Sequence, residues 1–128
     1  MKKLLTLFVS SLFAVAAFAG EYPDISIKEL DAAIKAGKVT VIDVMGSKSY
    51  AKGHVPGAIN FAEAGNDLGK SLPSDKDALI VAYCGGPKCQ AYKRGAAAAE
   101  KLGYTNVKHL TAGISGWVKA GMKTEAAK

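Results

Sequence analysis

The stretch ALIVAYCGGPKCQ, residues 78–90, decides the fold class of this chain. Residues 78–83 are apolar and partly β-branched, which is typical of a buried central strand. This strand pattern ends at Cys84, and the paired glycines and the proline that follow exclude a helix interior. A helix pattern over 90–102 comes next, so the stretch predicts a strand, a glycine-rich loop and a helix, the repeating unit of an α/β sheet.

Strand and helix patterns alternate on both sides of this unit. The alternation predicts a single α/β domain built around a sheet. The expected strands lie at 39–44, 58–61, 78–83 and 107–110, and the expected helices at 26–37, 49–52 and 90–102, with a last short helix around Trp117.

Local signals set several of the expected boundaries. Ser26 and Glu29 have capping-box spacing at the start of the first helix. Ser47 is a candidate cap for the short helix. Residues 63–76 are polar and read as irregular, with one helical turn at most, and 113–116 read as a turn. The helix at 90–102 should pack closely on the sheet through one face, which consists of Ala91, Gly95, Ala98, Ala99 and Leu102.

The first 19 residues have the three-part pattern of a secretory signal peptide. Lys2 and Lys3 precede an apolar run, which ends in the small-residue cleavage site at 17–19. The run is shorter than the roughly 20 apolar residues that span a membrane, which favours a cleaved signal over the alternative, an uncleaved membrane anchor. We expect no stable membrane insertion after cleavage. The expected organisation is a signal peptide at 1–19 and one domain at 20–128, located in the periplasm.

The charge of the chain argues against nucleic-acid binding. The formal net charge is +6, and it falls to +4 when Lys2 and Lys3 are removed with the signal. The lysines are scattered and Arg94 is the only arginine, whereas specific readout of bases depends heavily on arginine. The remaining positive charge predicts a mild attraction for small anions.

Cys84 is the candidate catalytic residue, because it lies where a central strand ends, and ligands of open α/β sheets bind beyond the carboxyl ends of their strands. If the loop curls around Cys84, its backbone amides and the following helix would stabilise a thiolate or the outer sulfur of a persulfide. The alternative is a buried, inert cysteine. The loop residues expected to form this binding site are Gly85, Gly86, Lys88, Cys89 and Gln90.

Three segments in order resemble the rhodanese (sulfurtransferase) family. They are VIDV with SYAKGHVPGAIN (41–44 and 49–60), AYCGGPKCQ (82–90), and the run from LGYTNV to AGISGW (102–117). The resemblance implies an α/β fold with about five mostly parallel strands and helices on both faces. It also implies that Cys84 accepts sulfur from a small sulfur-containing anion or persulfide donor, and passes it to a thiol, protein or cyanide-type acceptor. No metal and no cofactor are implied.

The chain departs from the family pattern near the loop. Met45 stands where many members have arginine, and Cys89-Gln90 aligns with an Arg-Ser pair. The loss of these cations argues against efficient turnover of thiosulfate, which is a dianion. The absence of arginine six positions after Cys84 also argues against a phosphatase of the Cys-x5-Arg type, which needs its bidentate grip.

Three roles remain open for Cys89. It could be a resolving thiol that attacks persulfidated Cys84, a resting-state disulfide partner, or a small loop residue without a partner. Two other functions therefore compete with sulfur transfer: a thiol–disulfide redox protein that uses Cys84 and Cys89, and a non-catalytic binding module.

Other notable residues have structural interpretations. We expect His54 to orient the glycine- and proline-containing turn at 53–57, and Asp43 to bond local backbone at its strand end. His109 has no metal-spaced partner, and Trp117 should pack in the core. Tyr83 and Tyr92 are candidates for lining the mouth of the pocket.

Overall fold

The computed structural model describes residues 21–127, so the expected signal peptide lies outside the described residues. In the described part, four parallel strands form one sheet in the order β2-β1-β3-β4. The strands are β1 (Thr40–Asp43), β2 (Ile59–Asn60), β3 (Leu79–Tyr83) and β4 (Asn106–His109). The helices are α1 (Ile27–Lys35), α2 (Ser47–Lys52), α3 (Phe61–Ala64), the 3-10 helix η1 (Gly65–Ser71), α4 (Tyr92–Lys101) and α5 (Gly113–Lys119).

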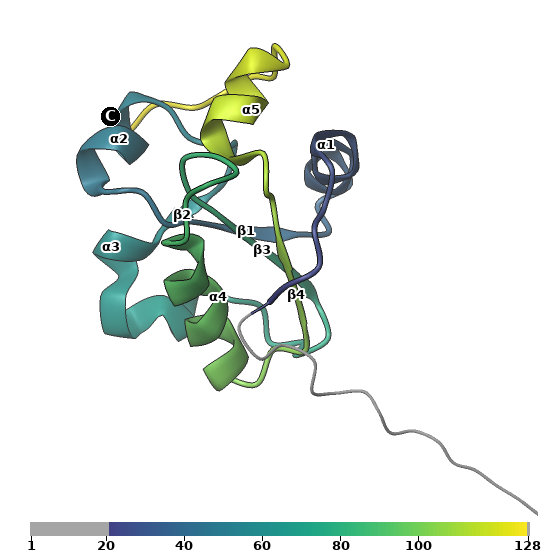
Figure 1. Cartoon of the computed structure of the whole chain (residues 1–128). Helices are drawn as coiled ribbons and strands as arrows, with labels where there is room; N and C mark the ends of the chain where they lie inside the picture. The colour runs from purple at the N-terminus through teal and green to yellow at the C-terminus, as the bar shows by residue number, and fades with distance from the viewer. Residues whose placement is uncertain (1–20, 128) are drawn as a thin grey trace, which may run out of the picture.

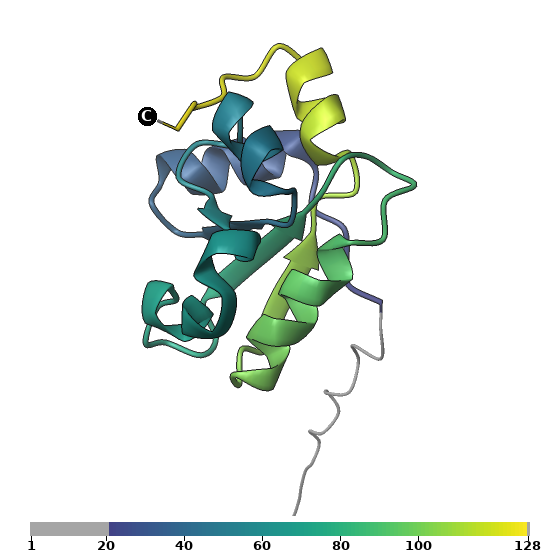
Figure 2. The same ribbon diagram turned by 90° about the vertical axis from the view of Figure 1, so that its left-hand side faces the viewer.

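Helices cover both faces of the sheet, as expected (Figures 1 and 2). α1, α2 and α5 lie on one face, and α3, η1 and α4 lie on the other. β3 serves both layers because successive strand residues point to opposite faces. Ile80 and Ala82 join the core under α4, whereas Val81 and Tyr83 join the core under α1 and α5.

The sheet has four full strands rather than about five. The segment before α1 supplies only an isolated parallel bridge, in which Asp24 pairs with His109 at the outer edge of β4. The amide of Ile25 donates to the His109 carbonyl at 2.9 Å, and the His109 amide donates to Pro23 at 2.8 Å. Pro23 has no amide hydrogen and cannot extend this hydrogen-bond ladder, so the expected fifth strand is reduced to a single bridge.

Some expected boundaries are confirmed and others are wrong. Ser26 caps α1 through a complete capping box with Glu29. Ser47 is not the cap of α2: it is the first helical residue, and Gly46 precedes it as N-cap. Residues 113–116 belong to α5 instead of forming a separate turn, and the polar 63–76 region contains the end of α3 and all of η1.

Close packing of α4 on the sheet depends on Gly95. A Cβ atom at this position would lie 2.7 Å from Val44 Cγ2 and 3.0 Å from Ile42 Cγ2. Part of the expected face is wrong, because Leu102 follows the helix as its C-cap and is 42% exposed. The buried residues of α4 are Tyr92, Gly95, Ala96 and Ala99.

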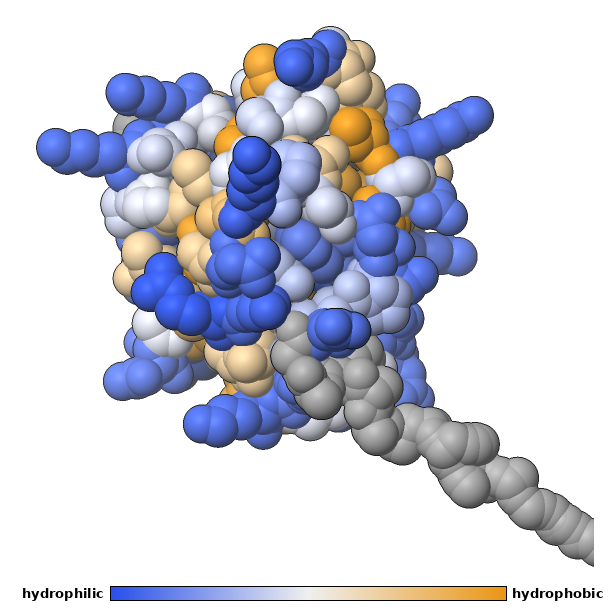
Figure 3. Space-filling view, viewed as in Figure 1, coloured by the Kyte–Doolittle hydropathy of each residue, from blue (hydrophilic) through white to orange (hydrophobic). Residues whose placement is uncertain are grey.

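The surface is mostly hydrophilic on the face seen in Figure 3, with small and separate hydrophobic patches. Within residues 21–127, no helix is long and apolar enough to cross a membrane. Trp117 is 1% exposed, which confirms its expected place in the core.

Candidate active site

Cys84 follows β3 directly and lies at the carboxyl end of the sheet, as expected. Its side chain is 1% exposed and belongs to the core beneath α4. A disulfide joins it to Cys89, with the two Cα atoms 6.2 Å apart. The structure therefore describes the oxidised form of the pair, in which Cys89 Sγ occupies the position next to Cys84 Sγ.

Among the described residues, one backbone amide contacts the sulfur of Cys84, and it is not one of the loop amides expected from the sequence. Tyr92, the first residue of α4, donates its N–H to Cys84 Sγ at 3.3 Å. The Cys89 amide instead donates to the Gly86 carbonyl at 3.0 Å. In the described chain, no protein acceptor pairs with the remaining expected amides, those of Gly85, Gly86, Lys88 and Gln90.

The loop between β3 and α4 is fixed to the first turn of α5 (Figure 2). Ile114 donates its amide to the Cys84 carbonyl at 2.9 Å, and Ser115 donates to Gly85 at 3.0 Å. Gly113 has φ +65°, and a Cβ atom there would lie 2.5 Å from the Gly86 nitrogen. A glycine is required at 113 because the two backbone segments approach so closely.

An aromatic stack supports the start of α4. The ring of Tyr92 lies 3.3 Å from that of His109, with an angle of 3° between the planes. His109 Nδ1 is 3.3 Å from the Thr111 hydroxyl, while Nε2 is buried and has no partner among the described residues. Burial lowers the pKa of His109, nearby Asp24 opposes this shift, and Lys93 adds to it. The ring of His109 thus packs against the side chain of the residue whose amide contacts Cys84.

We expect His109 to make the fold sensitive to acid. Because its pKa is lower in the folded state than the ordinary 6.5, the folded state favours neutral imidazole, and stability should fall as the pH drops below 6.5. The loss is at most about 1.4 kcal/mol per pH unit. Urea unfolding between neutral and acid pH should show this dependence in the wild type. His109→Phe keeps a ring on Tyr92 and should lack that part of the slope; an identical slope in both proteins would contradict the assignment.

Asp43 and Tyr83 form a buried polar pair on the face of the sheet opposite to Cys84. Asp43 accepts the Met45 amide at 2.7 Å, which agrees with the expected local bond, and it also accepts the Tyr83 hydroxyl. That hydroxyl accepts the Val55 amide at 3.0 Å. Burial raises the pKa of Asp43, while the Tyr83 bond opposes the shift. Tyr83 is fully buried here, so the expectation that it lines a pocket mouth is wrong.

Tyr83→Phe should destabilise the protein by roughly 2–4 kcal/mol, because it leaves a buried carboxylate oxygen and a buried amide without their partner. Chemical denaturation measures the change. Tyr50→Phe is a suitable control: it also removes a hydroxyl, which donates to the Ala58 carbonyl at 2.6 Å, but at a half-buried position. Equal losses in the two variants would contradict the role of the buried pair.

His54 has the structural role that its sequence context indicates. Its Nδ1 lies 2.8 Å from the Tyr50 carbonyl oxygen, and its ring stacks on Tyr50 with centroids 3.7 Å apart. Its backbone pairs with Glu125, which also accepts the Gly57 amide at 2.8 Å. The C-terminal segment thus fixes the turn that follows His54.

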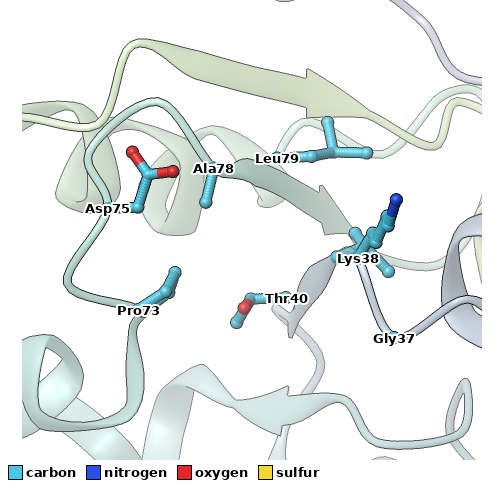
Figure 4. A pocket seen from close by; sticks show the side chains of 8 residues that line it. Gly37, Lys38, Thr40, Pro73, Asp75, Ala78 and Leu79 are labelled. Carbon is cyan, nitrogen blue, oxygen red and sulfur yellow. The ribbon is translucent and has the colours of Figure 1, made fainter.

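Two shallow cavities lie at opposite ends of the sheet. One of about 310 Å³ is lined by residues that include Lys38, Thr40, Asp75 and Leu79 (Figure 4). It lies at the start of β1 and β3, away from the strand ends where ligands of such sheets bind. Another, of about 250 Å³, lies beyond the end of β1, where Arg94 faces a lining that includes Met45. Arg94 and Met45 thus line the same cavity, and Arg94 supplies a cation there.

Within residues 21–127, no group of three or more His, Cys, Asp or Glu side chains is placed to hold a metal ion. The chemistry available at the carboxyl end of the sheet is that of Cys84, Cys89 and the surrounding amides. The fold and site together define a parallel α/β protein with a buried cysteine between its central strand and a helix N-terminus.

The chain belongs to the rhodanese-like domain family, whose model matches residues 26–120. An HTH-type transcriptional regulator of Mycobacterium tuberculosis, Rv0324, is 39% identical over 93 residues, which cover 71% of this chain and 39% of the regulator. The human thiosulfate:glutathione sulfurtransferase is 28% identical over 110 residues, covering 76% of this chain and 94% of the human protein. The crystal structure of the BH2092 protein from Bacillus halodurans is 32% identical, with a TM-score of 0.70, covering 82% of this chain and 77% of that one.

Proposed function

We propose that this protein is a sulfurtransferase or sulfane-sulfur carrier that forms a persulfide on Cys84. The observation that best supports this proposal is the position of Cys84 Sγ, which accepts a hydrogen bond from the Tyr92 amide at the start of α4. This amide and the positive end of the helix favour a sulfur anion over a neutral thiol. The reduced Cys84 thiolate attacks the sulfane sulfur of a donor, and the donor's remaining part leaves with the electron pair of the broken bond.

The free loop amides support the second half of this proposal. Gly85, Gly86, Lys88 and Gln90 carry amides with no acceptor in the described chain, and two glycines allow a ligand to approach the backbone closely. Donors of this kind stabilise the outer sulfur of a persulfide anion. The exposed Lys88 adds a positive charge at the rim of the loop.

The donor and acceptor classes follow from the site and from one relative. A small sulfur-containing anion or a persulfide is the proposed donor, because the loop offers amides and one lysine. The human relative is named for transfer from thiosulfate to glutathione, so a thiol is the proposed acceptor, with cyanide as a laboratory substitute. Export to an oxidising compartment is part of the proposal, since the Cys84–Cys89 disulfide is typical of such compartments.

An assay of sulfur transfer tests the proposal. Reduced protein should form thiocyanate when supplied with cyanide and either thiosulfate or polysulfide, and polysulfide should be the better donor because few cations remain at the site. No thiocyanate beyond that formed without protein, and no sulfur adduct with either donor, would overturn the proposal.

The disulfide favours a second candidate function, that of a redox protein cycling Cys84 and Cys89 without carrying sulfur. Such a protein would exchange electrons with dithiols but would form no persulfide. Mass spectrometry of reduced Cys89→Ser after exposure to polysulfide distinguishes the two functions, because only a sulfur carrier acquires an added sulfur on Cys84.

A further inference from the structure

The two cysteines of the loop differ in accessibility. Cys84 is 1% exposed, whereas Cys89 is half-buried between the exposed residues Lys88 and Gln90. A thiol from outside therefore reaches the sulfur of Cys89 more readily than that of Cys84. This asymmetry gives the disulfide a preferred direction of attack.

The hydrogen bond from Tyr92 reinforces that direction. Thiol–disulfide exchange is faster when the departing sulfur is stabilised as a thiolate. Attack on Cys89 makes Cys84 the leaving group, and Cys84 Sγ already accepts the Tyr92 amide at 3.3 Å. Reduction by this route releases Cys84 directly as the nucleophile that the proposed function needs.

The loop also places Cys89 within bonding reach of Cys84. The Cys89 amide closes a turn on the Gly86 carbonyl at 3.0 Å, and the loop is fixed at Cys84 and Gly85 by the amides of α5. The formed disulfide shows that this anchored loop accommodates a bond between the two sulfurs. A persulfide on Cys84 would therefore have a second thiol of the same chain beside it.

We propose that Cys89 is the built-in acceptor of the Cys84 persulfide, so that the protein reduces sulfane sulfur to sulfide and is then restored by a dithiol reductant. This inference rests on the proposed function. The Cys89 thiolate attacks the inner sulfur of Cys84–S–S⁻, which forms the Cys84–Cys89 bond. The bond to the outer sulfur breaks, and that atom leaves with the electron pair as sulfide, taking up the proton that Cys89 gave.

The electrons balance over the full cycle. The sulfane sulfur gains two electrons, and the two cysteines lose them as they form the disulfide. One thiol of the reductant then attacks Cys89 and expels the Cys84 thiolate, and its second thiol displaces Cys89. The reductant leaves as a disulfide, and both cysteines are again reduced. The protein is thus a persulfide reductase whose partner is a protein or small molecule with two thiols.

A single-turnover experiment tests the inference. Reduced wild type and Cys89→Ser are loaded with polysulfide, separated from excess donor, and followed for sulfide release without added thiol. The wild type should release about one sulfide per loaded sulfur and finish as the disulfide, whereas Cys89→Ser should keep its sulfur until a thiol is added. Equal release from both loaded proteins would overturn the inference. Failure of the proposed function is distinct, because then neither protein carries sulfur after loading.

A second experiment tests which of the two cysteines an external thiol attacks. Trypsin cleaves after Lys88 and so separates Cys84 and Cys89 into the peptides 77–88 and 89–93. The oxidised protein is treated with limiting glutathione and quenched with an alkylating agent. Glutathione should be found on peptide 89–93, with alkylated Cys84 on the other peptide. Glutathione mainly on peptide 77–88 would overturn the proposed direction of attack.

Discussion

Cys84→Ser is expected to abolish sulfur transfer to cyanide, with a loss on the order of 10³-fold or more, as for removal of other enzymatic nucleophiles. A serine hydroxyl is not ionised near neutral pH, and its oxygen cannot form a persulfide. The Tyr92 amide would then contact an oxygen that carries no sulfur. The measurement is thiocyanate formation by the reduced protein with polysulfide as donor, after subtraction of the thiocyanate formed without protein.

Cys89→Ser serves as the comparison, because it removes the same disulfide but keeps the Cys84 nucleophile. The lost disulfide spans only five positions and contributes little to stability. Cys89→Ser should therefore still become loaded with sulfur. Thiocyanate formation by Cys84→Ser at the wild-type rate would exclude Cys84 as the sulfur carrier.

Gly113→Ala is expected to destabilise the protein by about 3 kcal/mol or more and to reduce sulfur uptake by about tenfold or more. Two effects add at this position. Alanine is strained at φ +65°, and its Cβ would lie 2.5 Å from the Gly86 nitrogen. The loop must move away from α5, which weakens the bonds from Ile114 and Ser115 and displaces Cys84 from the Tyr92 amide.

Gly37→Ala separates the two effects. Gly37 has φ +69°, but a Cβ atom there would have nothing within 4 Å. Gly37→Ala should therefore lower the stability only by the backbone strain, about 1–2 kcal/mol, and leave sulfur uptake as in the wild type. Thermal unfolding measures the loss of stability in the two variants. Sulfur uptake is then compared at a temperature at which circular dichroism shows that both variants are folded. Equal effects of the two substitutions would show that contact with the loop at 113 is unimportant.

Much of the architecture was predictable because it is encoded locally. The β-branched run before Cys84 predicts β3, and the capping box at Ser26 predicts the start of α1. The weak fifth strand was not predictable, since a single bridge at Asp24 depends on how the chain enters the edge of the sheet. The helical state of residues 113–116 was missed because two glycines disfavour a helix, whereas docking of α5 on the Cys84 loop overrides that propensity.

The site was predictable in its chemistry but not in its detail. The sequence predicts Cys84 and the amides of the loop that follows it, yet the observed donor to the Cys84 sulfur is the amide of Tyr92. The helix begins two residues later than expected, and a residue pattern does not show which amide a helix start turns toward a neighbouring sulfur. For Tyr83 a signal existed: alternation along the strand places it on the face opposite Cys84, where it meets Asp43.

Peptide-resolved mass spectrometry of the reduced protein, after exposure to polysulfide and alkylation, tests the central claim most directly. We predict one added sulfur on peptide 77–88 of Cys89→Ser, which contains Cys84, and loss of that adduct when a thiol is supplied. No added sulfur on peptide 77–88 of Cys89→Ser would contradict the account, and so would an added sulfur on peptide 89–93 of the wild type without one on peptide 77–88.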